Sequence, residues 1–154
     1  MRMVLRRQFQ YETYGSLHKY KQLRAMAPCV ESFCSRLRHP ATKGHLELQQ
    51  LDLSLLGHLG HLYGHDGAYS RAAEWRTRAL EETSRILPED HPHIATSMNN
   101  LASNYLRRSR YEDAFHLADS ALSIFSLTLP SSHPHVAIAS SLVQDCKRHV
   151  AVSI

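Results

Sequence analysis

The sequence lacks any apolar run near the ~18 residues that a membrane-spanning helix needs, which excludes an integral membrane protein. The basic residues close to the N-terminus are not followed by the apolar core of a signal peptide. Cysteine is scarce and irregularly spaced, which excludes a disulfide framework and fits a reducing compartment. We therefore expect a soluble, cytoplasmic protein with free thiols at Cys29, Cys34 and Cys146.

Glycine is absent from the last 87 of the 154 residues, because all six glycines lie at or before Gly67. Turns in that part of the chain must therefore use Pro, Ser, His and Asp. The prolines there form two pairs, 88 and 92 followed by 130 and 134, and the pairs are 42 residues apart. This spacing indicates an internal repeat.

A shift of 42 residues aligns Leu59–Leu101 with Leu101–Val143 without a gap, and thirteen of the 43 positions are identical. The His-Pro-His element at 91–93 returns at 133–135. Chance does not explain such a block. Because these histidines repeat with the architecture, we interpret them as structural residues at helix starts, where a proline is well tolerated.

Each copy of the repeat predicts two helices, because apolar residues recur at steps of three and four. The second copy predicts helices near 92–108 and 111–128, and the first copy predicts helices near 50–65 and 68–86. Small residues alternate with Leu, Tyr and Trp along these stripes, as closely packed helix hairpins require.

A further helix is predicted at 134–149, with an apolar stripe formed by Ile138, Leu142, Val143 and Cys146. No partner helix follows it in the sequence. Two interpretations stay open: this helix caps a short solenoid, or the chain is a fragment or isoform of a longer array, which we favour.

The fold class predicted by these elements is all-α, a right-handed solenoid of antiparallel helix hairpins, short or fragmentary. The array is expected over 46–154, with units at about 50–91 and 92–133 and a terminal helix at 134–150.

Residues 1–45 do not carry the repeat and differ in charge from the rest of the chain. They hold nine Lys or Arg against two acidic residues, a net charge of +7, whereas 46–154 has a net charge of −3. We interpret this segment as a basic helical N-terminal cap or a pair of degenerate helices. Its charge leaves one alternative function open, the binding of nucleic acid or of an anionic surface.

The pattern of six residues in one unit resembles a tetratricopeptide repeat: Leu101, Ala102, Tyr105, Tyr111, Ala114 and Ala121. The 42-residue spacing, the Asp-His-Pro opening at 90–92 and the Asn-Asn-Leu-Ala run at 99–102 resemble more narrowly the repeats of the kinesin light chain family. The sequence departs from that pattern at Ser109, where members usually have glycine. The resemblance implies a concave groove, lined by the first helix of each hairpin, that binds segments of partner proteins. It also implies a role as a cargo adaptor or a scaffold.

The polar face of those first helices supplies the candidate groove. In the second unit its residues recur at steps of three and four opposite the apolar stripe, and matching positions exist in the flanking units. The predicted peptide-binding residues are Thr96, Asn99, Asn100, Ser103, Arg107, His58, His61 and Asp145. An Asn side chain offers two donors and an acceptor to an extended peptide backbone. Arg107 and Arg148 motivate a further hypothesis, a preference for acidic partners.

Catalysis and metal binding are not expected. The spacing of His58, His61 and His65 places three imidazoles on one helix face, so these residues are the candidate metal ligands, but no Cys or further carboxylate supports them beyond Asp66. No nucleophile motif or phosphate-binding glycine loop occurs. We predict a non-catalytic protein-protein interaction adaptor without a cofactor, for which a protein rather than a nucleic acid is the expected partner.

Overall fold

The computed structural model of the chain describes residues 24, 25, 27–29, 32 and 46–152. The chain divides into two compact units, Met1–Leu46 and Glu47–Ile154. The few described residues of the first unit are helical. The rest of that unit, with the cap and the basic binding surface predicted for residues 1–45, lies outside the described residues.

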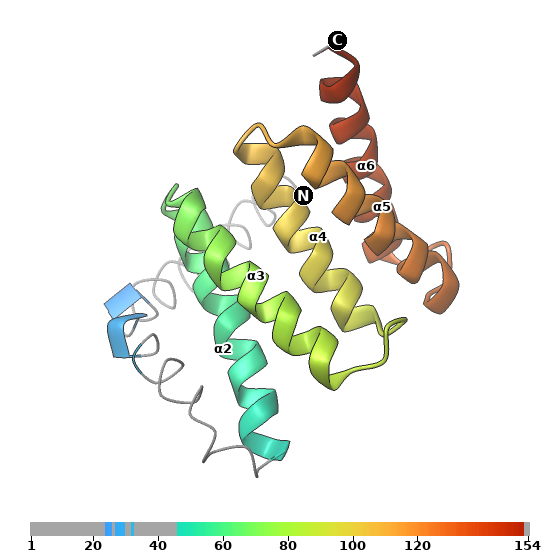
Figure 1. The fold of residues 1–154 in the computed structure, drawn as a ribbon. Helices are drawn as coiled ribbons and strands as arrows, with labels where there is room; N and C mark the ends of the chain where they lie inside the picture. The colour runs from blue at the N-terminus through green and yellow to red at the C-terminus, as the bar shows by residue number, and fades with distance from the viewer. Residues whose placement is uncertain (1–23, 26, 30–31, 33–45, 153–154) are drawn as a thin grey trace, which may run out of the picture. The chain divides into compact units, whose positions relative to one another are not determined.

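The second unit is built from consecutive helices joined by short turns (Figure 1). They are α2 (Leu46–His65), α3 (Tyr69–Ile86), α4 (Pro92–Arg107), α5 (Tyr111–Thr128) and α6 (Pro134–Val152). No strand occurs in the part of the chain that the structure describes, and none of its helices is long and apolar enough to cross a membrane. The predicted all-α solenoid of helix hairpins is confirmed, although α2 begins earlier than the sequence suggested.

The His-Pro-His elements start two of these helices in the same way. The His93 backbone N–H donates to Nδ1 of His91 at 3.2 Å, and the His135 N–H donates to Nδ1 of His133 at the same distance. Each imidazole thereby satisfies one of the backbone donors that a helix leaves unpaired in its first turn. The structural interpretation of these histidines is confirmed.

The turn inside each hairpin requires a left-handed backbone. Gly67, between α2 and α3, has φ of 75°, and Ser109, between α4 and α5, has φ of 59°. The two residues are 42 positions apart, so the repeat preserves the turn geometry while the residue changes. Glycine adopts this conformation without steric cost, whereas serine carries a Cβ into it.

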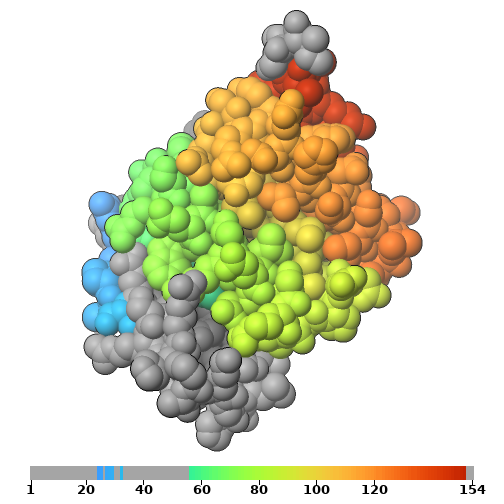
Figure 2. All heavy atoms as spheres, viewed as in Figure 1, coloured from blue at the N-terminus to red at the C-terminus, as the bar shows by residue number. Residues whose placement is uncertain are grey.

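Alanine lets the helices of the second hairpin pack closely against α6. Ala102, Ala114 and Ala118 are fully buried in one cluster with Leu142, Val143 and Cys146. A second cluster surrounds Phe125 with the fully buried Ala95, Ala121 and Ala139. On the face drawn in Figure 2 the side chains of α3, α4 and α5 form a continuous surface.

The apolar stripe predicted for the last helix is partly wrong. Leu142, Val143 and Cys146 are buried, but Ile138 is 53% exposed. The buried face of α6 instead continues through Ala139, which lies three and four residues before Leu142 and Val143 and occupies the position assigned to Ile138. The Cys146 thiol is free, and burial, together with the charge of Asp145, raises its pKa, so it acts as a small apolar group in the core.

Candidate functional site

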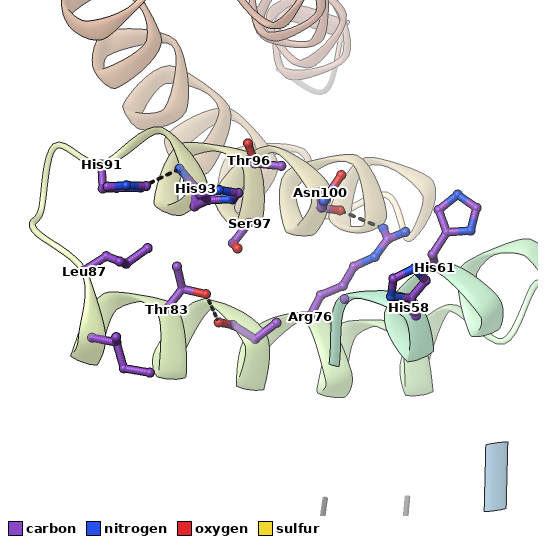
Figure 3. Close-up of a pocket in the computed structure, with 13 residues that line it drawn as sticks. His58, His61, Arg76, Thr83, Leu87, His91, His93, Thr96, Ser97 and Asn100 are labelled. Carbon is purple, nitrogen blue, oxygen red and sulfur yellow. Dashed lines mark hydrogen bonds between the residues drawn. The ribbon is translucent and has the colours of Figure 1, made fainter. Parts of the chain in front are cut away.

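A cleft of about 800 Å³ lies among α2, α3 and α4 (Figure 3). Its walls come from the first helices of two successive hairpins, α2 and α4, and from the helix between them. The lining residues are Gly57, His58, His61, Arg76, Ala79, Thr83, Ile86, Leu87, His91, His93, Thr96, Ser97 and Asn100. Both polar and apolar groups therefore face the same space.

The two ends of the cleft differ in chemistry (Figure 3). At one end His58 and His61 of α2 lie near Arg76 of α3 and Asn100 of α4. We call this the cationic end. The opposite end, which we call the Thr83 end, is formed by Thr83, Leu87, His91 and His93. An occupant lying along the cleft would meet charge at one end and flat or apolar surface at the other.

Arg76 reaches across the cationic end from α3 to α4. A Cβ added to Gly60 would lie 2.6 Å from Cγ of Arg76, so the arginine stem passes over α2 where that helix has no side chain. Nη1 of Arg76 then donates a hydrogen bond of 2.7 Å to the backbone carbonyl oxygen of Asn100. The side chain thus links the two hairpins and carries a positive charge to the cleft wall.

The electrostatic surroundings of this end are positive. Burial, with the nearby charge of Arg107, lowers the pKa of Arg76. Burial also lowers the pKa of His61, and the charges of Arg76, His65 and His58 add to that effect. No Asp or Glu is among the described residues that line the cleft. An anionic group placed here would be attracted by the same charges that disfavour the protonated histidine.

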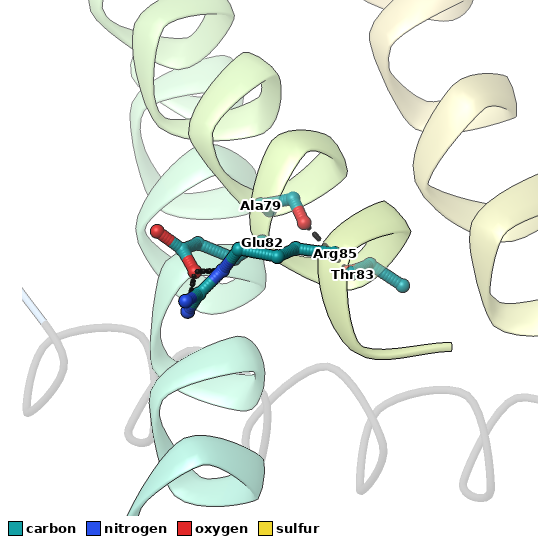
Figure 4. Close-up of polar contacts among 4 residues, drawn as sticks. All are labelled: Ala79, Glu82, Thr83 and Arg85. Carbon is teal, nitrogen blue, oxygen red and sulfur yellow. Dashed lines mark hydrogen bonds and ion pairs between the residues drawn. The ribbon is translucent and has the colours of Figure 1, made fainter. Parts of the chain in front are cut away.

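At the Thr83 end the threonine hydroxyl and Nδ1 of His91 already form hydrogen bonds within the protein. Oγ1 of Thr83 donates to the carbonyl oxygen of Ala79 at 2.6 Å, so its hydroxyl is bonded within α3 (Figure 4). On the same helix Arg85 pairs with Glu82, with Nε to Oε2 at 3.0 Å. The imidazole rings of His91 and His93 are stacked, with centroids 5.3 Å apart and planes 11° apart. This end offers flat, weakly polar surface.

Four of the eight predicted groove residues line the cleft: Thr96, Asn100, His58 and His61. Their convergence follows from the stacking of α2 and α4, which the repeat implied. The Thr96 hydroxyl donates to the carbonyl oxygen of Pro92 at 3.0 Å, so it is bonded within its own helix. Asn100 is exposed, and its side chain is available to an occupant.

The other four predicted residues lie outside the lining of this cleft. Asn99 is half-buried, and its Oδ1 atom is buried without a hydrogen-bond partner. The Arg107 guanidinium lies 6.0 Å from the centre of the Tyr69 ring. Asp145 forms an ion pair with Nη2 of Arg148 at 3.0 Å. Ser103 is half-buried. The structure therefore does not bring all eight residues together in one place.

Several lining residues were not predicted from the sequence, above all Arg76, Thr83 and Ser97. They belong to the second helix of the first hairpin and to a position beside the predicted polar strip. One signal was present: Arg76 aligns with Ala118 in the repeat, so a long cation replaces a small core residue. An exchange of that kind marks a place where the two units differ in packing.

The candidate metal ligands do not form a metal centre. His58, His61 and His65 are neighbours on α2, but no group of three or more His, Cys, Asp or Glu side chains among the described residues is arranged to hold a metal ion.

Comparison with known proteins identifies the repeat. Residues 51–126 match the family model of the tetratricopeptide repeat. This segment, which covers α3 and α4 and most of α2 and α5, belongs to the tetratricopeptide repeat family. No curated protein sequence is significantly similar to the chain.

Two solved structures show the same fold. One is BtubC (BKLC) from P. vanneervenii, with a TM-score of 0.64 and 21% identity, over 88% of this chain and 57% of that one. The other is a kinesin light chain-like protein from Podosopora anserina with nearly identical TPR-like repeats, with a TM-score of 0.62 and 20% identity, over 87% of this chain and 68% of that one. The repeats are thus similar in fold to kinesin light chain-like repeats, and the chain spans little more than half the length of BtubC.

Proposed function

We propose that the chain is a non-catalytic, cytoplasmic adaptor whose cleft binds an extended segment of a partner protein. The observation that carries this proposal is the cleft itself, which runs between the first helices of two successive hairpins and offers charge, amide and flat ring surfaces to one occupant. Its volume of about 800 Å³ is within the range of binding pockets for ligands of a few residues.

The residues of α4 that line the cleft suit a peptide backbone. The Asn100 amide supplies two donors and one acceptor, and the Ser97 hydroxyl lies three residues before it on the same helix. Asn99, Ser103, Arg107 and Asp145 remain part of the proposal as a continuation of the polar strip along α4 and α6. The positive charge at the cationic end favours segments that carry Asp or Glu.

A matched pair of blocking variants tests the site. A display library of random peptides is first selected on the wild-type chain, and the recovered peptides are then titrated against Ser97→Trp and Ser120→Trp. Ser97 lines the cleft, whereas Ser120 is an exposed residue of α5. We expect the first variant to lose binding, because an indole fills the cleft, and the second to keep it. Equal binding by both variants would rule out the cleft as the site.

The acidic preference is tested with the same peptides. Arg107→Glu should weaken the binding of acidic peptides by about three- to tenfold, because it reverses a charge close to Arg76. The control is Arg108→Glu, which makes the same change at the neighbouring exposed arginine. Affinity that is unchanged in Arg107→Glu, or reduced equally in both variants, contradicts the preference. Circular dichroism spectra of all variants establish that they are folded.

A further inference from the structure

The guanidinium of Arg76 has more hydrogen-bond donors than partners. It carries a fork of N–H donors, and within the described part of the chain its hydrogen bond is the one from Nη1 to the carbonyl oxygen of Asn100, at 2.7 Å. Arg85, Arg110 and Arg148 each pair with a carboxylate three residues away, whereas no described Asp or Glu pairs with Arg76. Arg76 therefore brings a positive charge without a counter-ion, and most of its donors, to the cleft.

This side chain is held in place but is not sealed off. Two glycines of α2 make room for it, because a Cβ built on Gly60 would lie 2.6 Å from its Cγ and one built on Gly64 would lie 3.1 Å from its Nη2. Arg76 is half-buried, and none of its nitrogen atoms is among the described polar atoms that are buried without a partner. Its remaining N–H groups are therefore reachable from the cleft, and the planar fork is fixed before anything binds.

Donors from three helices surround the same space at the cationic end (Figure 3). His58 and His61 come from α2, Arg76 comes from α3, and the exposed amide of Asn100 comes from α4. Each imidazole donates one N–H when it is neutral and two when it is protonated. Donors on three sides suit a tetrahedral group with three acceptor oxygens better than a planar carboxylate, which offers two.

The cationic groups at this end also repel one another. Burial, with the charge of Arg107, lowers the pKa of Arg76, and burial, with the charge of Arg76, lowers the pKa of His61. A carboxylate brings one negative charge, whereas a phosphate monoester brings about −1.5 to −2 at pH 7. A phosphate therefore compensates these charges more completely.

The cationic end is not needed for the repeat to fold. In the second unit the residue equivalent to Arg76 is Ala118, and the residue equivalent to Asn100 in the next helix is Leu142. Both are buried in an apolar cluster. The second unit forms the same hairpin without these polar groups, so a role beyond packing accounts for them in the first.

We propose that the cationic end of the cleft is a subsite for one phosphorylated side chain, a phosphate monoester, of the bound segment. The remaining N–H groups of Arg76 donate to two phosphate oxygens. The imidazoles of α2 and the Asn100 amide donate to the phosphate from the neighbouring helices. This inference rests on the proposed function, in that the phosphate belongs to a protein segment lying in the cleft. Arg76 is then the specificity-determining residue, because it supplies both the charge and the fork.

The experiment uses small probes, so it does not depend on finding the partner. N-acetyl-O-phosphoserinamide is titrated into the full chain and followed by ³¹P NMR and by the ring signals of His58 and His61, beside the N-acetyl amide of aspartic acid and inorganic phosphate. We expect the phosphoserine probe to bind about tenfold more tightly than the aspartate probe, because of its greater charge. It should also bind more tightly than inorganic phosphate, because its amide groups meet the Asn100 side chain.

Either kind of equality overturns the proposal. Equal binding of the aspartate probe would mean that the cationic end takes any acidic group. Equal binding of inorganic phosphate would assign the site to the free ion and not to a modified side chain.

Two variants of different kinds sharpen the result. Arg76→Gln removes the charge and should weaken binding of the phosphoserine probe by about tenfold, whereas Arg85→Gln, at an exposed arginine of the same helix outside the cleft, should not change it. Gly60→Ala keeps every charge but places a Cβ against the arginine stem, so it should also weaken binding by displacing the guanidinium.

Circular dichroism establishes that these variants are folded. If neither Arg76→Gln nor Gly60→Ala folds, His61→Asn serves instead and should weaken binding by about threefold, with His116→Asn on α5 unchanged. Full affinity in any folded variant of Arg76, or in both Gly60→Ala and His61→Asn, contradicts the proposal.

The two proposals fail separately. If the partner peptides ignore Ser97→Trp while the phosphoserine probe binds in a manner that depends on Arg76, the cleft has a phosphate site but is not the peptide groove. If Ser97→Trp abolishes peptide binding while the phosphoserine probe binds no better than the aspartate probe, the groove stands and the phosphate subsite is wrong.

Discussion

The two hairpins of this chain share their backbone plan and differ in what fills the space between successive first helices. Between α4 and α6 the space is occupied by Phe125, packed among Ala95, Ala121 and Ala139. Between α2 and α4 the equivalent residue is Thr83, and a cleft of about 800 Å³ remains. One unit thus fills the position with a large buried ring, and the other has a small buried side chain there at the wall of the cleft.

A second exchange accompanies the first. Ala102 and Ala118 pack as small core residues in the second hairpin, whereas the first has Gly60 and Arg76 at those positions. Because Gly60 has no side chain, the Arg76 side chain can cross α2 and donate a hydrogen bond to α4. Repeat proteins are stabilised mainly by contacts between neighbouring units, so exchanges at these positions alter both the stability and the binding surface.

The largest effect that the comparison predicts comes from Phe125→Thr, which gives the second unit the residue of the first. The loss of a buried ring should lower the free energy of unfolding by about 3–4 kcal/mol, because the surrounding alanines cannot collapse into the space. Urea unfolding followed by circular dichroism measures the change.

The matched truncation on the other unit is Thr83→Ala, which we expect to cost about 1 kcal/mol, because Thr83 is buried but the change removes only a hydroxyl and a methyl group. If Thr83→Ala proves as costly as Phe125→Thr, Thr83 contributes as much to stability as its counterpart and the contrast between the two units disappears.

The helices of both hairpins could be predicted from the sequence, but the side chains that distinguish the two units could not. Apolar periodicity and the 42-residue repeat located the helices, because they reflect the helical period and the stacking of identical units. Thr96 and Asn100 were found because they lie on the polar face of α4. Arg76 was missed because its role depends on the absence of a side chain at Gly60, a residue on another helix.

Burial was the other property that periodicity predicted poorly. Ile138 was expected in the core because it is apolar, yet Ala139 takes the buried place on α6. Asn104 is polar, yet it is fully buried. Residue type alone gives the average location of a side chain, and the packing of a given helix face overrides it.

The two units also differ at Asn104, and the replacement of this residue gives a further prediction. Neither Nδ2 nor Oδ1 of its amide has a hydrogen-bond partner, whereas the equivalent residue on α2 is Leu62, which is 3% exposed. Asn104→Leu should raise the free energy of unfolding by about 1–3 kcal/mol, because it removes an unpaired buried amide.

Urea unfolding of Asn104→Leu beside Leu62→Asn checks this prediction in both directions, since the second variant should be destabilised by a comparable amount. A loss of stability in Asn104→Leu would mean that the amide is satisfied, for instance by a buried water molecule, and that the polar residue contributes to the fold.

The smallest effect concerns the turns, where the two units keep the same geometry with different residues. Ser109 and Gly67 both have a left-handed backbone, which costs a residue with a Cβ about 1–3 kcal/mol. Glycine avoids this strain but loses more conformational entropy on folding, about 0.5–1 kcal/mol. Ser109→Gly should therefore raise the free energy of unfolding by about 0.5–1 kcal/mol, and Gly67→Ser should lower it by a similar amount.

Urea unfolding resolves both changes if the slope of the transition is unchanged. Should Ser109→Gly lower stability instead, the Ser109 side chain must stabilise its turn by more than the strain that it imposes, and the two turns would differ in energy as well as in sequence.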